Sequence, residues 1–310
     1  MTPTSRSASR PCTAPGIPQR RTRRGRSPTN RWAVVGGLVA AIVVFAGVAA
    51  CSSGGGGSAS SAGGSVQLAH VHGLGVDPGT GELYAGSHHG LIRFPQRGEP
   101  SRVGGLVQDF MGFAVVGPNH FLASGHPGAG QDGPSNVGLI ESTDAGRTWR
   151  TLSLAGQADF HTLKASHGLI YGSNVGQLMV SQDGKVWDTR ARIAMADLAV
   201  SPKNAETLLA TTQQGLARST DGGRSFGLVA GAPLLQLLTW TDTGDLVGIT
   251  PEGAVQVSSD GGTTWSQRGS AGGAPEALTA SGNQIYAAVE GKIVSSDDGG
   301  STFKTRYEGS

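Results

Sequence analysis

A short turn motif recurs five times in the chain and constrains its fold more than any other feature. The motif combines serine, aspartate and glycine with a final aromatic residue, as in Ser258–Trp265 (SSDGGTTW). Its copies begin at Ser142, Ser181, Ser219, Ser258 and Ser296. Consecutive copies are therefore 39, 38, 39 and 38 residues apart. A fixed period of this size indicates a repeat architecture in which each repeat is one small structural unit.

Each copy predicts a tight turn between two strands. Short polar side chains such as Ser258 and Asp260 hydrogen-bond to nearby backbone amides and hold a turn. The glycines tolerate the positive φ that such a turn demands. An apolar run precedes the motif, and the final Trp or Phe supplies a large surface for packing. Strand, turn and strand therefore recur in register along the chain.

Alignment on the turn extends the pattern to six units of four short strands. The six expected second strands lie at 82–86, 120–124, 169–173, 207–211, 245–249 and 284–288. Four strands of about five residues, repeated at this period, match a β-propeller blade. Each unit supplies its own four strands. The sequence does not decide whether residues 66–69 add a further strand where the ring closes. We expect an all-β, six-bladed propeller in residues 66–310, with blades near 66–104, 105–150, 151–190, 191–228, 229–267 and 268–307.

The segment before the propeller, residues 1–50, has the composition of a basic tail and an export signal. Residues 1–31 carry eight Arg and no Asp or Glu, and the 19 residues 32–50 carry no charge. A basic region, an apolar stretch and small residues in this order are typical of a signal peptide. The sequence Val-Ala-Ala-Cys at 48–51 resembles the lipobox of bacterial lipoproteins, which implies cleavage before Cys51 and lipidation of its thiol. The alternative is an uncleaved transmembrane helix.

Both alternatives place the rest of the chain at the membrane and outside the cytoplasm. Residues 51–65 are rich in Gly and Ser and predict a flexible linker after Cys51. Removal of the eight N-terminal Arg leaves 16 of 24 Lys and Arg beside 22 Asp and Glu, a net charge near −6. This charge disfavours nucleic acid as a partner. We expect a monomer anchored by its lipid to the extracytoplasmic face of the cell membrane.

The turn motif resembles the Asp-box, or BNR, repeat of sialidase-like propellers. Similar repeats occur in the sortilin-type receptor domain and in the photosystem II assembly and stability factor. The whole chain also looks like bacterial lipoproteins that are labelled BNR-repeat glycosyl hydrolases. These families include hydrolases, receptors and assembly factors, so the resemblance implies the fold and leaves the function open. A sialidase would need three Arg for the substrate carboxylate, and no Arg lies in a first strand or in a loop between second and third strands.

Six of the eight histidines are expected on one face, where first strands begin and second strands lead into third strands. They are His70, His72, His88, His89, His126 and His161. A two-residue step puts the imidazoles of His70 and His72 on one side of a strand. That pair suits an anionic ligand or one metal ion, with His89 or His88 as a third nitrogen. Zn²⁺ or Cu²⁺ accepts such ligands; the alternative is that these side chains only hydrogen-bond to neighbours or water.

Carboxylates are expected on the same face. Asp109, Asp159 and Asp197 start neighbouring first strands, and Asp109 can add an oxygen to a ligand site formed by the histidines. Two of these carboxylates can also form the acid and base pair of a glycosidase. We therefore expect a non-catalytic scaffold or assembly protein that binds a ligand, a metal ion or a partner protein through this face. A glycoside hydrolase of the BNR-repeat group is the alternative, and protein or carbohydrate is the expected ligand.

Overall fold

The computed structural model describes residues 66–105 and 108–309. The predicted signal peptide, the lipidation site Cys51 and the linker lie outside these residues. The described residues form strands, turns and loops, and none of them belongs to a helix long and apolar enough to cross a membrane.

The strands form six antiparallel sheets, each of four strands. The first three sheets contain β1 (Val71–Val76), β2 (Leu83–Ser87), β3 (Gly90–Phe94) and β4 (Ser101–Arg102); β5 (Asp109–Gly117), β6 (His120–His126), β7 (Leu139–Ser142) and β8 (Arg150–Ser153); β9 (Thr162–Ser166), β10 (Leu169–Asn174), β11 (Gln177–Ser181) and β12 (Asp188–Arg192). The last three contain β13 (Asp197–Val200), β14 (Leu208–Thr212), β15 (Gly215–Ser219) and β16 (Gly227–Leu228); β17 (Leu237–Trp240), β18 (Leu246–Ile249), β19 (Ala254–Ser258) and β20 (Ser266–Ser270); β21 (Pro275–Ser281), β22 (Gln284–Val289), β23 (Lys292–Ser296) and β24 (Lys304–Glu308).

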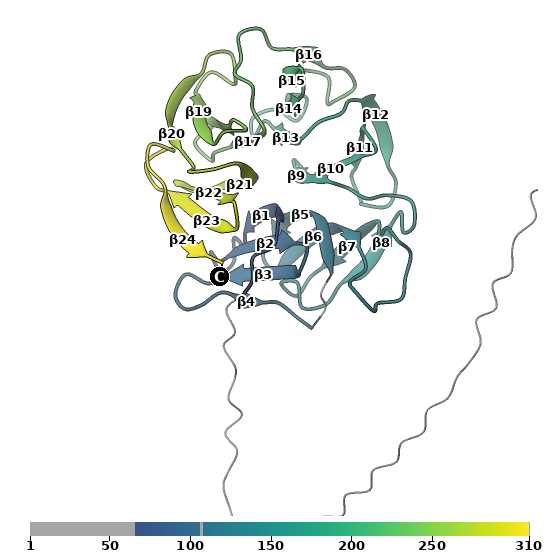
Figure 1. Ribbon diagram of the computed structural model, residues 1–310. Helices are drawn as coiled ribbons and strands as arrows, with labels where there is room; N and C mark the ends of the chain where they lie inside the picture. The colour runs from purple at the N-terminus through teal and green to yellow at the C-terminus, as the bar shows by residue number, and fades with distance from the viewer. Residues whose placement is uncertain (1–65, 106–107, 310) are drawn as a thin grey trace, which may run out of the picture. The chain divides into compact units, whose positions relative to one another are not determined.

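Each sheet is built from four strands that are consecutive in the chain. The sheets are arranged around a common centre, with the first strand of each sheet innermost (Figure 1). The fold is therefore a six-bladed β-propeller, which confirms the predicted fold class. Second strands are almost fully buried, whereas the fourth strands are mostly exposed, because each blade has neighbours on both faces and solvent at its outer edge.

Five turns between third and fourth strands share one hydrogen-bond pattern. In the β19–β20 turn the buried Ser258 Oγ accepts a hydrogen bond from the Gly262 amide at 2.7 Å and donates one to Asp260 Oδ1 at 2.8 Å. The φ angles of Gly261 and Gly262 are 73° and 87°, a region that favours glycine. The same bond from a glycine amide to the serine hydroxyl occurs in the turns that begin at Ser142, Ser181, Ser219 and Ser296. The recurring motif therefore connects the third and fourth strands of five blades in the described residues.

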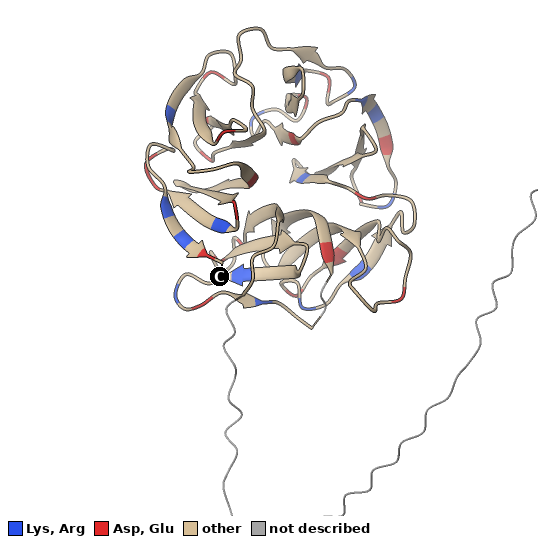
Figure 2. Ribbon diagram, viewed as in Figure 1, with Lys and Arg blue, Asp and Glu red and all other residues tan. Residues whose placement is uncertain are grey.

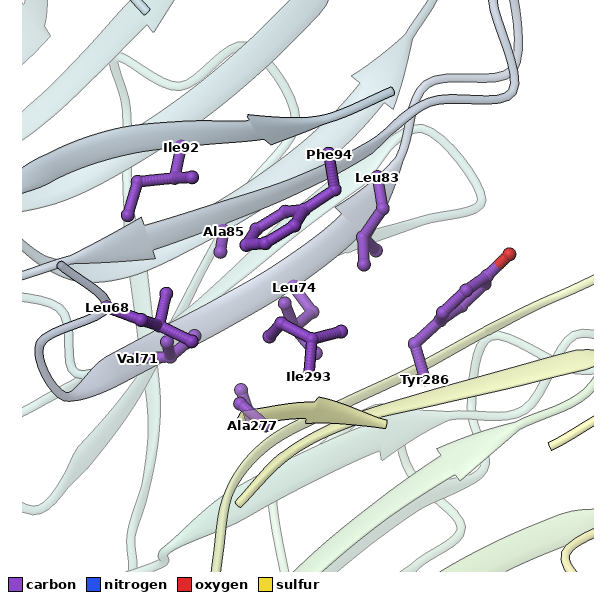
Figure 3. Packing of buried hydrophobic residues seen from close by; sticks show 11 residues of the cluster. Leu68, Val71, Leu74, Leu83, Ala85, Ile92, Phe94, Ala277, Tyr286 and Ile293 are labelled. Atoms are coloured by element: carbon purple, nitrogen blue, oxygen red, sulfur yellow. The ribbon is translucent and has the colours of Figure 1, made fainter. Parts of the chain in front are cut away.

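Hydrophobic side chains fill the interfaces between neighbouring blades. Figure 3 shows the interface of the first and last blades, where Leu74 and Phe94 lie near Ala277 and Ile293. All four side chains are buried. Burial of large apolar side chains of this kind stabilises the fold by roughly 1.5–3 kcal/mol each.

The ring closes without an exchange of strands between the first and last blades in the described residues. Residues 66–69 form no strand, although Leu68 is buried against both blades. The Val71 amide donates a hydrogen bond to Glu276 Oε2 at 2.8 Å, and the Tyr307 hydroxyl donates one to the Val66 carbonyl. Packing and a few polar contacts therefore join β1 to β21.

Candidate functional site

A central channel lies between the inner edges of the six blades. Its volume is about 500 Å³, and residues of all six first strands line it. Its titratable lining residues are His72, His161, Lys164, Asp197 and Glu276. They lie toward the rim where the first strands begin, which we name the channel mouth. Figure 2 shows acidic residues on β13 and β21 and a basic residue on β9 around this centre.

Three imidazoles, named here the histidine cluster, meet at the channel mouth: His70, His72 and His88. The Nε2 atoms of His72 and His88 are 3.3 Å apart. The ring centroid of His70 lies 4.7 Å from that of His72 and 5.8 Å from that of His88. A backbone hydrogen bond from His88 to the His70 carbonyl brings the β2–β3 turn against the start of β1. The structure thus unites three of the six predicted histidines.

Two carboxylates lie beside the outer nitrogens of this cluster. His88 Nδ1 donates a hydrogen bond to Asp109 Oδ1 at 2.7 Å, and His70 Nδ1 lies 3.4 Å from Glu276 Oε2. Burial, with repulsion from His70 and His88, lowers the pKa of His72 to about 4. His72 is therefore neutral at pH 7. Because Asp109 binds Nδ1–H of His88, the Nε2 atom of His88 points toward His72 as an acceptor.

A second group surrounds Asp159 on the neighbouring blades. Asp159 Oδ2 accepts a hydrogen bond from His161 Nε2 at 2.8 Å and lies 3.4 Å from His126 Nε2. His126 also bonds through Nδ1 to the Ser135 carbonyl. The hydrogen bond with Asp159 raises the pKa of His161. The other carboxylate oxygen of Asp159 is buried and has no hydrogen-bond partner among the described residues.

The side chain of Asp197 is buried and forms contacts that hold neighbouring blades together. Its side chain is only 7% exposed, pairs with Lys164 Nζ at 3.0 Å, and accepts hydrogen bonds from the backbone amides of Leu198 and Leu238. Lys164 belongs to the preceding blade and Leu238 to the following one. Asp197 therefore links three blades. The expected site residues do not include Lys164, although a charged residue inside an apolar first strand indicates a specific partner.

His89 lies apart from the histidine cluster. It is exposed, and no hydrogen bond of its side chain occurs within the described part of the chain. His89 is a predicted metal ligand together with His70 and His72. In the structure His88, and not His89, lies beside these two residues. No three His, Cys, Asp or Glu side chains of the described residues are already arranged to hold a metal ion.

Comparison with known proteins identifies the fold. No family model and no curated protein matches the chain. Solved structures of similar fold include the GH74 enzyme of Niastella koreensis (TM-score 0.57, 14% identity), YCF48 bound to D1 peptide (0.51, 21%) and the gluconolactonase XC5397 of Xanthomonas campestris (0.59, 12%). The match to the Niastella enzyme covers 77% of this chain and 45% of that chain. The corresponding shares are 77% and 82% for YCF48, and 74% and 86% for the gluconolactonase. The chain thus spans less than half of the Niastella enzyme.

These neighbours define the class of protein as a β-propeller and go no further. Sequence identity at this level shows the shared fold and not a shared activity. Both enzymes and a peptide-bound protein occur among them. The relationship to Asp-box repeats, the lipid anchor and the ligand stay predictions.

Proposed function

We propose that this protein is a lipid-anchored, extracytoplasmic propeller that binds a protein or carbohydrate ligand at its channel mouth without catalysing a reaction. The observation that carries the proposal is the gathering of five histidines there. His70, His72 and His88 form one group, and His126 and His161 form another. Their side chains are at least partly exposed, so they are accessible to a ligand. The predicted export signal and Cys51 support the location.

The state of the carboxylates also favours binding over hydrolysis. A glycosidase commonly needs two carboxyl groups that flank the scissile bond, about 5–9.5 Å apart. Asp197 is committed to Lys164 and to two backbone amides, and Asp109 is committed to His88. Asp159 keeps one buried oxygen without a hydrogen-bond partner among the described residues.

A glycoside hydrolase remains the second candidate because of Asp159 and the fold shared with the GH74 enzyme. Asp159 would be its acid or base, with a neighbouring histidine to tune it. A panel of aryl glycosides and polysaccharides separates the two candidates. Turnover by the wild-type chain that Asp159→Asn abolishes would establish the enzyme and refute the scaffold.

The binding proposal is tested with the full chain, purified in detergent and immobilised, and incubated with membrane and envelope extracts. His161→Ala changes an exposed mouth residue. Lys185→Ala changes an exposed residue of a third-to-fourth-strand turn on the opposite rim. We expect His161→Ala to reduce capture of the main ligand and Lys185→Ala to leave it unchanged. Equal capture by both variants would refute the channel mouth as the contact site.

A further inference from the structure

We propose that the histidine cluster binds one Zn²⁺ ion, with His72 and His88 as its first two ligands and His70 as the third. The inference rests on the proposed function in that it names one ligand of the same channel mouth. Zinc binding and partner binding are measured separately. Either proposal can therefore be refuted while the other is supported.

The spacing of the first two nitrogens matches a tetrahedral ion. Two imidazole nitrogens at a Zn–N distance of about 2.05 Å and a tetrahedral angle are about 3.3 Å apart. The Nε2 atoms of His72 and His88 are 3.3 Å apart. Two adjacent nitrogens of a square-planar ion at the same bond length would be about 2.9 Å apart. The separation is the one that a tetrahedral Zn²⁺ ion requires.

The three rings also have the spacing of a shared ion. Imidazoles bound to one tetrahedral zinc through nitrogen have centroids about 5 Å apart. The centroid distances here are 4.7 Å from His70 to His72, 4.7 Å from His72 to His88, and 5.8 Å from His70 to His88. The centroid distances therefore lie near those of three imidazoles that share one ion.

A carboxylate already orients one of the ligands. Metal-binding histidines commonly donate their second ring N–H to a carboxylate, which fixes the tautomer and aims the other nitrogen at the metal. Asp109 does this for His88 at 2.7 Å. Glu276 Oε2 lies 3.4 Å from Nδ1 of His70, a longer contact that leaves the ring of His70 free to turn. His72 coordinates through Nε2 once its proton resides on Nδ1, because Nε2 is the nitrogen that faces His88.

His70 must turn its ring to complete the site. The described residues contain no preformed set of three ligands, so two nitrogens are in place and one is not. The side chain of His70 is 51% exposed and its contact with Glu276 is long, so little opposes this rotation. Water or a group of a bound partner would occupy the fourth position of the tetrahedron.

The test is a Zn²⁺ titration of the full chain, in detergent and after removal of metals with EDTA, followed by calorimetry. We expect one equivalent of zinc whose binding is lost in His72→Ala and in His88→Ala. Asp109→Asn keeps the ligands but loses the orienting carboxylate, and should weaken binding by roughly 10- to 100-fold. His89→Ala is the matched control, an adjacent histidine outside the cluster, and should bind as the wild type does.

A second readout reports geometry. Co²⁺ in place of Zn²⁺ should give the intense visible absorption of a tetrahedral nitrogen site, and His72→Ala should remove it. No zinc binding by the wild type, equal weakening in His89→Ala and His72→Ala, or Cu²⁺ binding without Zn²⁺ binding would each overturn the proposal. Thermal melts of all variants identify any loss of binding that comes from unfolding.

Discussion

The hydroxyl of Ser258 offers a direct measure of what the recurring turn contributes to stability. It is buried, accepts the Gly262 amide at 2.7 Å and donates to Asp260 at 2.8 Å. Ser258→Ala leaves the Gly262 amide without a partner inside the turn. A buried donor left unsatisfied costs about 1–3 kcal/mol. We assign no cost to the lost bond with Asp260, because water replaces it at that fully exposed carboxylate.

The expected loss of unfolding free energy is therefore about 2 kcal/mol. In a domain of this size that corresponds to a fall in Tm of about 4–8 °C. Urea titration and calorimetry of the full chain in detergent measure both quantities. Ser219→Ala should behave like Ser258→Ala, since its hydroxyl accepts the Gly223 amide at 2.8 Å in the equivalent turn.

Ser135→Ala is the control for these variants. Ser135 is exposed and its side chain makes no hydrogen bond within the described residues, so its removal should change stability by less than about 0.5 kcal/mol. The reasoning fails if Ser258→Ala is as stable as Ser135→Ala. In that case the turn would be held by its backbone conformation and its glycines, and the serine would be incidental.

Three further predictions concern packing, acid stability and anchoring. Gly112→Ala should lower the urea midpoint sharply, because its Cβ would lie 2.2 Å from the Phe160 carbonyl oxygen, whereas Gly227→Ala has open space and should be close to wild type. Hydrogen bonds, foremost from the Thr148 hydroxyl, lower the pKa of Asp144 from 3.8 to about 2, so the stability that they add is full above about pH 4 and is lost as pH falls toward 2. The stability gap between wild type and Asp144→Asn should accordingly shrink between pH 7 and pH 2, and a constant gap would contradict this. Cys51→Ser should move the chain from the membrane to the soluble fraction on cell fractionation; retention at the membrane would favour the uncleaved helix.

The fold could be predicted from the sequence because it repeats. One turn motif is weak evidence for any fold, but five copies at a constant spacing fix the length of the repeat and the face on which each turn lies. The second strands also repeat as short apolar runs. Local chemistry and global architecture agree in such a chain, so the architecture follows from the pattern.

The detail of the site could be predicted only in part. A β-bulge between Val71 and Gly73 interrupts the alternation of side chains, and His70 lies just before β1. The prediction that His70 and His72 lie together assumes strict alternation, which the strand does not have. The contact between their rings therefore does not follow from the sequence spacing. In the β2–β3 turn the choice between His88 and His89 depends on the turn geometry. Sequence spacing alone does not determine it.

The histidine cluster also lies at the place where the ring closes. His70 and His72 belong to the first blade, Asp109 to the second, and Glu276 to the last. Glu276 accepts the Val71 amide and lies beside His70, so one carboxylate serves both the closure and the cluster. No strand is exchanged between the first and last blades in the described residues. The proposed zinc ion would therefore stabilise the folded, closed ring, because binding to the folded state alone shifts the folding equilibrium.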